Sequence, residues 1–385
     1  MSERTVRLLA ILVSIAVLLA GCSQPHEPAP PASTSSGGEL PVARAPESEG
    51  ALTITFIDVG QGDCTLIECP DGAQVLVDCG STARGPEGRR REDVAAFLDE
   101  RLDDELEVLV ITHPDQDHIN FLAPTSANAS SVLGERHVGR AILSLERAAY
   151  EETGVGERLM TWLDASAADV RYLTPEDASA EGEPSPLFAC GDTSVYVLAA
   201  SEPSTRSSES WQRNTPSIVL MLERPGDERP FRAILTGDAT RETEAAILAR
   251  YSSDFLDVDV LKIGHHGSLT STVDPDDPSW RWLAVTSPAY AITTAGHHGG
   301  YLLPRCGVTD GVLASPSLVS THACHLLECA EPAPQRCPGS TDGSWCTYSS
   351  TAGLLNSSNN GDVTVIVRRG EWSVTSTRGQ SQCAP

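Results

Sequence analysis

Residues 108–118 read Val-Leu-Val-Ile-Thr-His-Pro-Asp-Gln-Asp-His, and this segment decides the fold. Its first four residues are apolar, which predicts a short buried strand. Four side chains able to bind a metal follow within six residues: His113, Asp115, Asp117 and His118. Imidazole together with carboxylate suits zinc or manganese. The alternative is a solvated acidic turn that happens to contain two histidines.

Two later apolar strands end in side chains of the same kind. Residues 233–238 read Ala-Ile-Leu-Thr-Gly-Asp and end in Asp238. Residues 259–268 read Asp-Val-Leu-Lys-Ile-Gly-His-His-Gly-Ser and carry His265 and His266. Each ending alone is weak evidence, since Gly-Asp is common in turns. Together with the first segment they predict ligands along one rim of a sheet, where layered α/β proteins tend to have their sites.

The first 50 residues are predicted to direct export and to lie outside the folded domain. Residues 8–20 are apolar after Arg4 and Arg7, and the run is short for a membrane span, so residues 1–21 are predicted to be a signal peptide. Residues 22–50 are rich in Pro, Ser and Ala, which predicts a disordered tether. We expect no transmembrane span in the mature chain, and one large layered domain over residues 51–385.

The signal ends in Leu-Ala-Gly-Cys at residues 19–22, which resembles the bacterial lipoprotein signal. The resemblance implies cleavage before Cys22 and a lipid on that residue. It therefore implies an exported protein anchored to the cell envelope, in the outer membrane if the cell is Gram-negative. An ordinary signal peptide with a chance cysteine is the alternative.

The cysteines also favour an oxidising compartment. Without Cys22, ten of the eleven remain, and we expect disulfides among them. Several lie in a stretch that we interpret as an insertion, residues 302–360, held by its own bridges; a zinc-binding cysteine cluster is the alternative. The ten are Cys64, Cys69, Cys79, Cys190, Cys306, Cys324, Cys329, Cys337, Cys346 and Cys383.

The chain has a formal net charge of −26, which argues against tight binding along a nucleic acid duplex. One basic cluster stands out, made of Arg84, Arg89, Arg90 and Arg91. It is either a solvated loop or a surface that meets an anionic substrate. Runs of predicted strands with helices between them favour a layered α/β fold with two central sheets. Within it, residues 92–102, 147–163 and 241–250 are predicted helices.

The sequence resembles the metallo-β-lactamase superfamily, and within it the hydrolase domain of ComEC-type DNA-uptake proteins. The resemblance implies a four-layer αββα fold with the Cys-rich insertion near the C-terminus. It spans residues 54 to about 300. The segments that carry it are Phe-Ile-Asp-Val-Gly-Gln-Gly-Asp at residues 56–63, Val-Asp-Cys-Gly at 77–80, Thr112 to His118, Asn214 to Leu220, Leu-Thr-Gly-Asp at 235–238 and Lys262 to Ser268.

The resemblance also implies roles for individual residues. One divalent ion would bind His113 and Asp115; the other would bind Asp117, His118 and His265. Asp238 would bridge the two ions. As catalytic groups, Asp117 would orient or deprotonate a water, while Lys262 or His266 would steady the phosphoryl group or leaving oxygen. Asp58, Asp63 and Asp78 would orient the histidines, or else serve as turn residues.

A family histidine is absent near Asn214, which bears on whether the first metal site is filled. Two further departures from the family pattern concern substrate choice: Asn120 and Phe121 stand where the family has Gly-Gly, and Leu303 stands where it has another histidine. His297 and His298 lie just upstream and could replace the latter, or could be surface residues.

We expect a metal-dependent hydrolase with one or two zinc or manganese ions, a phosphodiesterase or nuclease acting on DNA or nucleotide phosphoesters at the cell surface. The acidity favours a small phosphodiester or single-stranded ends. The alternatives are hydrolysis of a carbon ester, lactone or amide, and a lipid-anchored non-catalytic binding protein on the same fold.

Overall fold

The computed structural model describes residues 50–83, 88–126, 129–178, 184–298, 300–330, 345–369 and 371–378. The predicted signal peptide and nearly all of the predicted tether lie outside these ranges. Within them, no helix combines the length and apolar character needed to cross a bilayer.

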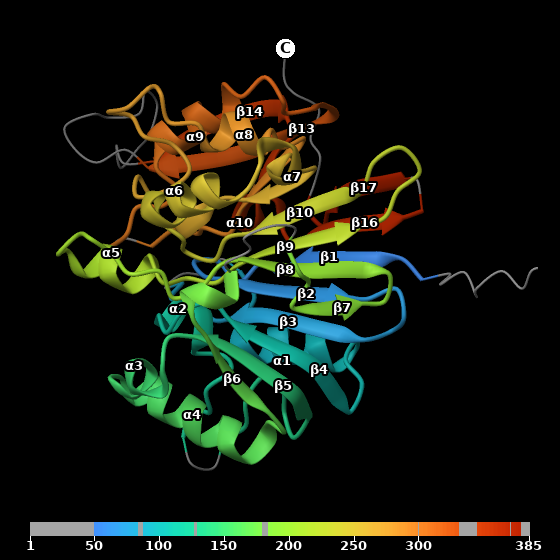
Figure 1. The fold of residues 1–385 in the computed structure, drawn as a ribbon, viewed down its shortest axis with the longest axis vertical. Coiled ribbons are helices and arrows are strands. Elements are labelled where there is room, and N and C mark those ends of the chain that lie inside the picture. The colour runs from blue at the N-terminus through green and yellow to red at the C-terminus, as the bar shows by residue number, and fades with distance from the viewer. Residues whose placement is uncertain are drawn as a thin grey trace, which may run out of the picture. The chain divides into compact units, whose positions relative to one another are not determined.

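Two large sheets form the centre of the structure (Figure 1). The first has eight strands in the order β17-β16-β1-β2-β3-β4-β5-β6, antiparallel from β17 to β3 and parallel from β3 to β6. The strands are β1 (Leu52–Phe56), β2 (Cys64–Glu68), β3 (Gln74–Cys79), β4 (Glu105–Ile111), β5 (His137–Ser144), β6 (Val170–Leu173), β16 (Val363–Arg368) and β17 (Glu371–Ser376).

The second sheet has seven strands in the order β15-β12-β11-β10-β9-β8-β7. Strands β10, β11, β12 and β15 run parallel, so their carboxyl ends meet at one edge. The strands are β7 (Phe188–Cys190), β8 (Thr193–Ala199), β9 (Val219–Arg224), β10 (Phe231–Leu235), β11 (Val260–Lys262), β12 (Tyr290–Thr293) and β15 (Leu354–Asn356).

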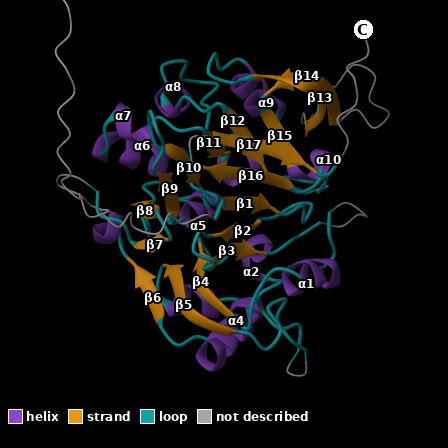
Figure 2. Ribbon diagram, turned by 90° about the vertical axis from the view of Figure 1, so that its right-hand side faces the viewer, coloured by secondary structure: helices purple, strands orange, loops and turns teal. Residues whose placement is uncertain are grey.

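Helices cover the outer faces of both sheets, with α3 and α4 below and α6 to α9 above in Figure 1. Figure 2 shows the same layers from the side, with the two sheets between the helices of their outer faces. The helices are α1 (Arg91–Asp99), α2 (Gln116–Ile119), α3 (Arg147–Glu151), α4 (Gly154–Ser166), α5 (Glu209–Asn214), α6 (Arg241–Arg250), α7 (Ser253–Leu256), α8 (Trp282–Thr286), α9 (Cys306–Leu313) and α10 (Ser357–Asn360), with 3-10 turns η1 (Pro175–Ala178) and η2 (Gly264–Gly267).

Three apolar clusters fill the spaces between these layers. The first joins the facing sides of the two sheets, through residues such as Val110 and Leu220. The second packs the outer face of the first sheet against α1 and α4, and the third packs the second sheet against α6, α8 and α9. Strands β3 and β4 contribute to the first two clusters because their residues alternate between the two faces. The predicted four-layer αββα fold is therefore confirmed.

Two sequence predictions need correction. Residues 147–163 form two helices rather than one, because the Thr153 side chain accepts a hydrogen bond from the Gly156 amide and begins α4 afresh. The region between Cys306 and Cys346, which showed no regular periodicity, contains α9 and the hairpin of β13 (Ser320–Ala330) with β14 (Trp345–Ala352).

Disulfides tie distant parts of the fold together. Cys64 pairs with Cys79 between β2 and β3, and Cys306 pairs with Cys329 within the predicted insertion. Cys69 pairs with Cys190 across 121 residues and joins the two sheets. Closing a loop of this length stabilises a fold by roughly 4–5 kcal/mol in the chain-entropy account. Cys324 and Cys346 are disulfide-bonded as well, and the sulfur atoms of Cys306, Cys329 and Cys346 lie within 4.8 Å of one another.

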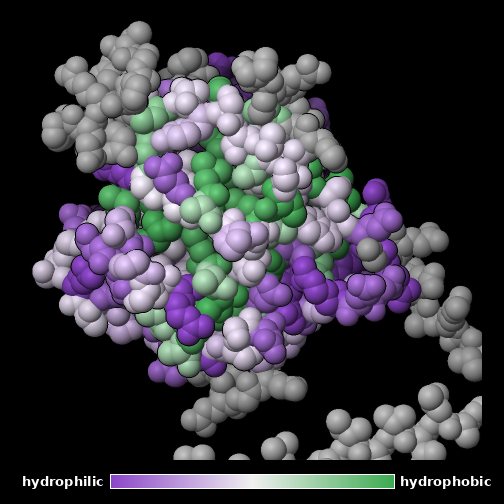
Figure 3. Space-filling model, turned by 90° about the horizontal axis from the view of Figure 1, so that it is seen from above, coloured by the Kyte–Doolittle hydropathy of each residue, from purple (hydrophilic) through white to green (hydrophobic). Residues whose placement is uncertain are grey.

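The hairpin β13–β14 lies at the upper end of the molecule in Figure 1. Seen from above, apolar side chains reach the surface there between polar ones (Figure 3). Leu326 of β13 is one of the exposed large apolar residues, at 45%.

Candidate metal centre

The predicted ligands meet where strands of both sheets end. Asp238 follows β10, and His265 and His266 lie in η2 after β11. The turn and short helix after β4 bring His113 and His118 from the first sheet. A cavity of about 750 Å³ opens beside them.

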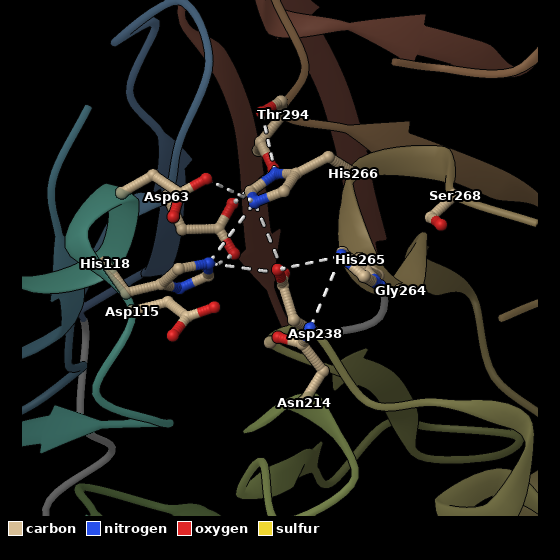
Figure 4. Close-up of polar contacts among 12 residues, drawn as sticks. Asp63, Asp115, His118, Asn214, Asp238, Gly264, His265, His266, Ser268 and Thr294 are labelled. Atoms are coloured by element: carbon tan, nitrogen blue, oxygen red, sulfur yellow. Dashed lines mark hydrogen bonds and ion pairs between the residues drawn. The ribbon is translucent and has the colours of Figure 1, made fainter. Parts of the chain in front are cut away.

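Asp238 lies among four histidines, with two near each carboxylate oxygen. Figure 4 shows its carboxylate beside His118, His265 and His266. Oδ1 is 3.2 Å from Nε2 of His118 and 3.3 Å from Nε2 of His266. Oδ2 is 3.8 Å from Nε2 of His113 and 3.9 Å from Nε2 of His265. Every histidine thus directs the same ring nitrogen toward one carboxylate.

The other ring nitrogen of each histidine, Nδ1, lies within hydrogen-bond distance of a neighbouring oxygen. Such contacts fix the ring orientation and leave Nε2 to bind a metal, as outer-sphere partners do in known metal sites. The Nδ1 contacts are His118 with the Asp78 carboxylate at 2.8 Å, His266 with the Thr294 carbonyl at 3.0 Å, His265 with the Thr270 hydroxyl at 2.6 Å and His113 with the Thr112 hydroxyl at 3.1 Å.

The chemistry of these donors fits divalent metal ions. Nε2 of His113 is buried and makes no hydrogen bond within the described part of the chain, and Oδ1 of Asp238 has the nitrogens of His118 and His266 beside it. A buried polar atom without a hydrogen bond is costly, so Nε2 of His113 indicates a missing partner. One atom from each of Asp63, His118, Asp238 and His266 lies within 4.8 Å of the others, close enough to share an ion. Imidazole and carboxylate are ligands that zinc and manganese accept.

Asp115 and Asp117 complete the set from the turn after β4. Oδ2 of Asp115 is 3.8 Å from Nε2 of His113, and Oδ2 of Asp117 is 3.5 Å from Nε2 of His266. Both aspartates line the cavity. The structure therefore brings all six predicted ligands together. By distance, however, His265 groups with His113 rather than with His118.

The pKa values of the buried histidines shift in both directions, according to how close each ring lies to the carboxylates. Burial alone would lower the pKa of His118, but Asp238 and Asp78 outweigh it and raise that pKa well above its ordinary value. Burial opposes the same effect at His266, where Asp238 and Asp63 raise the pKa to about 10. At His113, burial lowers the pKa.

The carboxylates respond in the opposite direction. Burial would raise the pKa of Asp238, yet His266 and His118 hold it well below the usual range. In the protein alone, protons on histidines balance the buried carboxylates. A metal ion would replace those protons, so binding should release them.

The backbone around these residues is specialised. Gly237 has φ +51°, and a Cβ there would lie 2.7 Å from the Thr112 hydroxyl, so only glycine fits before Asp238. His265 and His266 both adopt left-handed conformations, with φ of 47° and 51°. Non-glycine residues at such φ cost on the order of 1–2 kcal/mol each and are typical of functional sites.

Lys262 does not reach the cavity. Its side chain is 2% exposed, and its amine lies 2.7 Å from Oδ2 of Asp63 and donates to the Gly237 carbonyl at 2.9 Å. Asp63 lies beside the histidines and also accepts from the Thr294 hydroxyl. This placement suits Lys262 for holding Asp63 rather than for contacting a substrate.

The other predicted outer residues divide into two groups. Asp78 contacts His118 as expected, and its carboxylate also accepts from the Thr112 amide at 2.7 Å. Asp58 instead binds Arg378 at 2.7 Å and the Gly60 amide, away from the histidines.

The two candidate replacements for the missing family histidine also separate. His298 lines the cavity, whereas His297 lies 3.2 Å from Glu328 and packs against Trp345 of the β13–β14 hairpin with the two rings tilted. Asn214 lines the cavity as well and lies 3.5 Å from Nε2 of His265.

The basic cluster does not meet the cavity through any described residue. Arg89 pairs with Asp362, Arg90 pairs with the exposed Asp93, and Arg91 donates to backbone carbonyls. The fourth arginine lies outside the described residues. These contacts favour a structural role for the cluster.

The sequence did not single out two residues of the cavity wall, Arg213 and Tyr301. Arg213 precedes Asn214 in α5, and only the fold reveals that its guanidinium reaches Asp115. Tyr301 is 50% exposed and stacks on His298 with ring centroids 4.3 Å apart.

Comparison with known proteins finds a match to one superfamily and similarity to two curated proteins. The profile of the Metallo-beta-lactamase superfamily matches residues 57–128. ComE operon protein 3 of Bacillus subtilis (strain 168) is 26% identical over 269 residues, covering 67% of this chain and 30% of that protein. Recombination protein 2 of Haemophilus influenzae (strain ATCC 51907 / DSM 11121 / KW20 / Rd) is 28% identical over 277 residues, covering 72% of this chain and 28% of that protein.

The chain thus corresponds to less than a third of the length of these curated relatives. Among solved structures, a long form RNase Z from yeast matches 66% of this chain and 38% of its own at 10% identity, with a TM-score of 0.35.

Proposed function

Because this chain carries a metallo-β-lactamase superfamily domain with similarity to ComEC-type competence proteins, we propose that it is a metal-dependent phosphodiesterase. Its substrates would be DNA or nucleotide phosphoesters at the cell surface. The observation that carries the proposal is the convergence of four histidine Nε2 atoms on Asp238 beside an open cavity.

The residues around the cavity would have separate roles in metal binding and catalysis. His113, His118, His265 and Asp238, with Asp115 and Asp117, would hold one or two zinc or manganese ions. Such ions supply Lewis acidity and lower the pKa of water toward neutrality.

Asp117 faces both His266 and the cavity, so it would accept a hydrogen bond from the attacking water and orient it. Burial would raise the pKa of Asp117, but the contact with His266 lowers it below its ordinary value. The carboxylate is therefore ionised and able to accept. His266 lines the cavity and could steady the leaving oxygen.

The place of action is part of the proposal. The disulfides Cys64–Cys79, Cys69–Cys190 and Cys306–Cys329 support an oxidising compartment, since such bonds are rare in the cytosol. Export and a lipid on Cys22 would place the hydrolase at the cell envelope. Labelling cells with a radioactive fatty acid, beside Cys22→Ser, would test the anchor.

The activity is tested by measuring bound metal and turnover on the same samples. Protein purified with its disulfides formed would be assayed on bis-nitrophenyl phosphate and single-stranded DNA, with zinc or manganese added. We expect bound divalent metal, and hydrolysis that Asp117→Ala abolishes and the exposed control Asp276→Ala retains.

Metal without phosphodiester turnover would refute this function. Cleavage of a carbon ester in its place would support the ester alternative. Absence of metal and of both activities would leave a non-catalytic binding protein.

A further inference from the structure

Arg213 supplies the cavity wall with positive charge. Among the described residues that line the cavity it is the only lysine or arginine, and the same lining includes four carboxylates, those of Asp115, Asp117, Glu209 and Asp238. The whole chain has a formal net charge of −26. An anionic substrate therefore approaches a largely negative protein and meets one fixed guanidinium.

The contacts of Arg213 leave part of the guanidinium for another partner. Its Nε donates to Oδ1 of Asp115 over 2.6 Å. A second nitrogen lies 3.6 Å from Glu209, whose side chain is 83% exposed, so that solvent screens the pair. A guanidinium has five N–H donors in a planar fork. The Arg213 side chain is 34% exposed on the cavity wall, so its remaining donors can meet an oxygen there.

Asp115 gives the contact a second consequence. While Oδ1 accepts from Arg213, Oδ2 lies 3.8 Å from Nε2 of His113. Arg213 thus holds one oxygen of Asp115 and turns the other toward the histidines. The same side chain connects the cavity wall to the candidate metal centre.

We propose that Arg213 binds an anionic oxygen of a phosphodiester substrate while holding Asp115 in place. The proposal rests on the phosphodiesterase function proposed above, and it assigns to Arg213 the phosphate contact for which the sequence analysis offered Lys262 or His266. Lys262 is unsuited to this contact because its buried amine is engaged by Asp63 and the Gly237 carbonyl. Guanidinium groups form strong, directional hydrogen bonds with phosphate oxygens.

Two substrates that share the same leaving group but differ in charge distinguish phosphate binding by Arg213 from support of the fold. Methyl 4-nitrophenyl phosphate is an anionic diester, and dimethyl 4-nitrophenyl phosphate is the neutral triester. Hydrogen bonds to charged groups contribute about 1.5–3 kcal/mol, so Arg213→Gln should lower kcat/KM for the diester roughly 10- to 100-fold. The triester, which carries no charge, should lose less activity than the diester, because it loses only the support that Arg213 gives to Asp115.

The matched control is Arg206→Gln. Arg206 lies over the Trp211 ring, near the start of α5 but not on the cavity wall. The control loses the same charge, so it reports any effect of net charge alone, and we expect the preference for the diester to be retained. Arg213→Lys, which keeps the charge without the fork, should recover part of this preference and serves as the second variant if Arg213→Gln does not fold.

A binding measurement removes the dependence on turnover. Titration of inorganic phosphate into zinc-loaded protein should give a Kd about tenfold weaker for Arg213→Gln than for the unmodified protein, for loss of one charge-assisted hydrogen bond. Equal losses on both substrates, or an unchanged phosphate Kd, would overturn the proposal. If the unmodified protein hydrolyses neither ester, the proposed function fails, and the phosphate titration still decides the role of Arg213.

Discussion

The four histidines around Asp238 come from two chain segments that are built in different ways. His113 and His118 are called the first pair here, and His265 and His266 the second pair, according to the segment that carries them. His113 and His118 follow β4 and are completely buried, and His118 is held by the carboxylate of Asp78. His265 and His266 lie after β11 with left-handed backbone conformations, held by a hydroxyl and a backbone carbonyl. The first pair depends on the sheet and on charge, whereas the second depends on a strained loop. We therefore expect the two pairs to respond differently to mutation.

The largest effect should come from Asp238, because both pairs face it. Asp238→Asn removes the charge that balances both histidine pairs while keeping the side-chain volume. We expect loss of bound metal and a fall in diester hydrolysis of about 10³-fold, equivalent to about 4 kcal/mol in the transition state. Elemental analysis and the nitrophenyl assay measure both quantities. Near-normal metal content in this variant would remove Asp238 from the centre of the site.

A smaller effect should follow from breaking only the first pair. Asp78→Asn keeps the shape but weakens the contact that orients His118. Loss of such an outer partner typically lowers metal affinity 10- to 100-fold. Competition with a chromophoric chelator would give the affinity. An unchanged affinity would mean that the sheet alone orients this ring.

The second pair should be less sensitive still. Thr270→Val replaces the hydroxyl that contacts Nδ1 of His265 and leaves the first pair untouched. We expect zinc affinity to fall about tenfold at most, at the lower end of the range for outer partners. The same chelator competition applies. A larger loss than in Asp78→Asn would reverse the order of importance of the two pairs.

The smallest effect on metal binding is expected at Glu244, which acts instead on the stability of the loop that carries the second pair. Glu244 of α6 is buried and accepts from the Thr272 amide at 2.7 Å. Burial raises the pKa of Glu244 to about 8. A raised acid pKa means that the folded state keeps a proton which the unfolded state has lost.

Stability should therefore fall as the pH rises from about 4.5 to about 8, by at most about 1.4 kcal/mol per pH unit for one proton. Glu244→Gln should flatten this dependence. Urea unfolding at pH 5.5 and 7.5 measures the difference. Equal slopes in both proteins would show that Glu244 ionises normally when folded.

The sequence predicted the first half of the site more fully than the second. Residues 113–118 place their ligands within one turn after a strand, so local pattern was sufficient. The grouping of His265 with His113 depends on a left-handed backbone at η2, which side-chain patterns do not reveal. The burial of Lys262 against Asp63 joins residues that are distant in sequence, and only the packing of the two sheets brings them together.

The fold shows the same contrast between local and distant interactions. Strands with continuous apolar runs, such as β4 and β10, lie where they were expected. Strands β13 and β14 were not predicted, because their region shows no regular apolar periodicity. They pair with each other, and the Cys306–Cys329 bridge joins β13 to α9. Arg213 was missed because its partner Asp115 is 98 residues away in the sequence.

Anomalous diffraction from crystals grown with zinc would test the central claim most directly. The claim is that divalent metal binds at Asp238 through the Nε2 atoms of His113, His118 and His265. We predict anomalous density beside the Asp238 carboxylate, at about 2.0–2.1 Å from the histidine nitrogens and on one or both of its sides. Density elsewhere, or Nε2 atoms hydrogen-bonded within the protein and no density at Asp238, would contradict it.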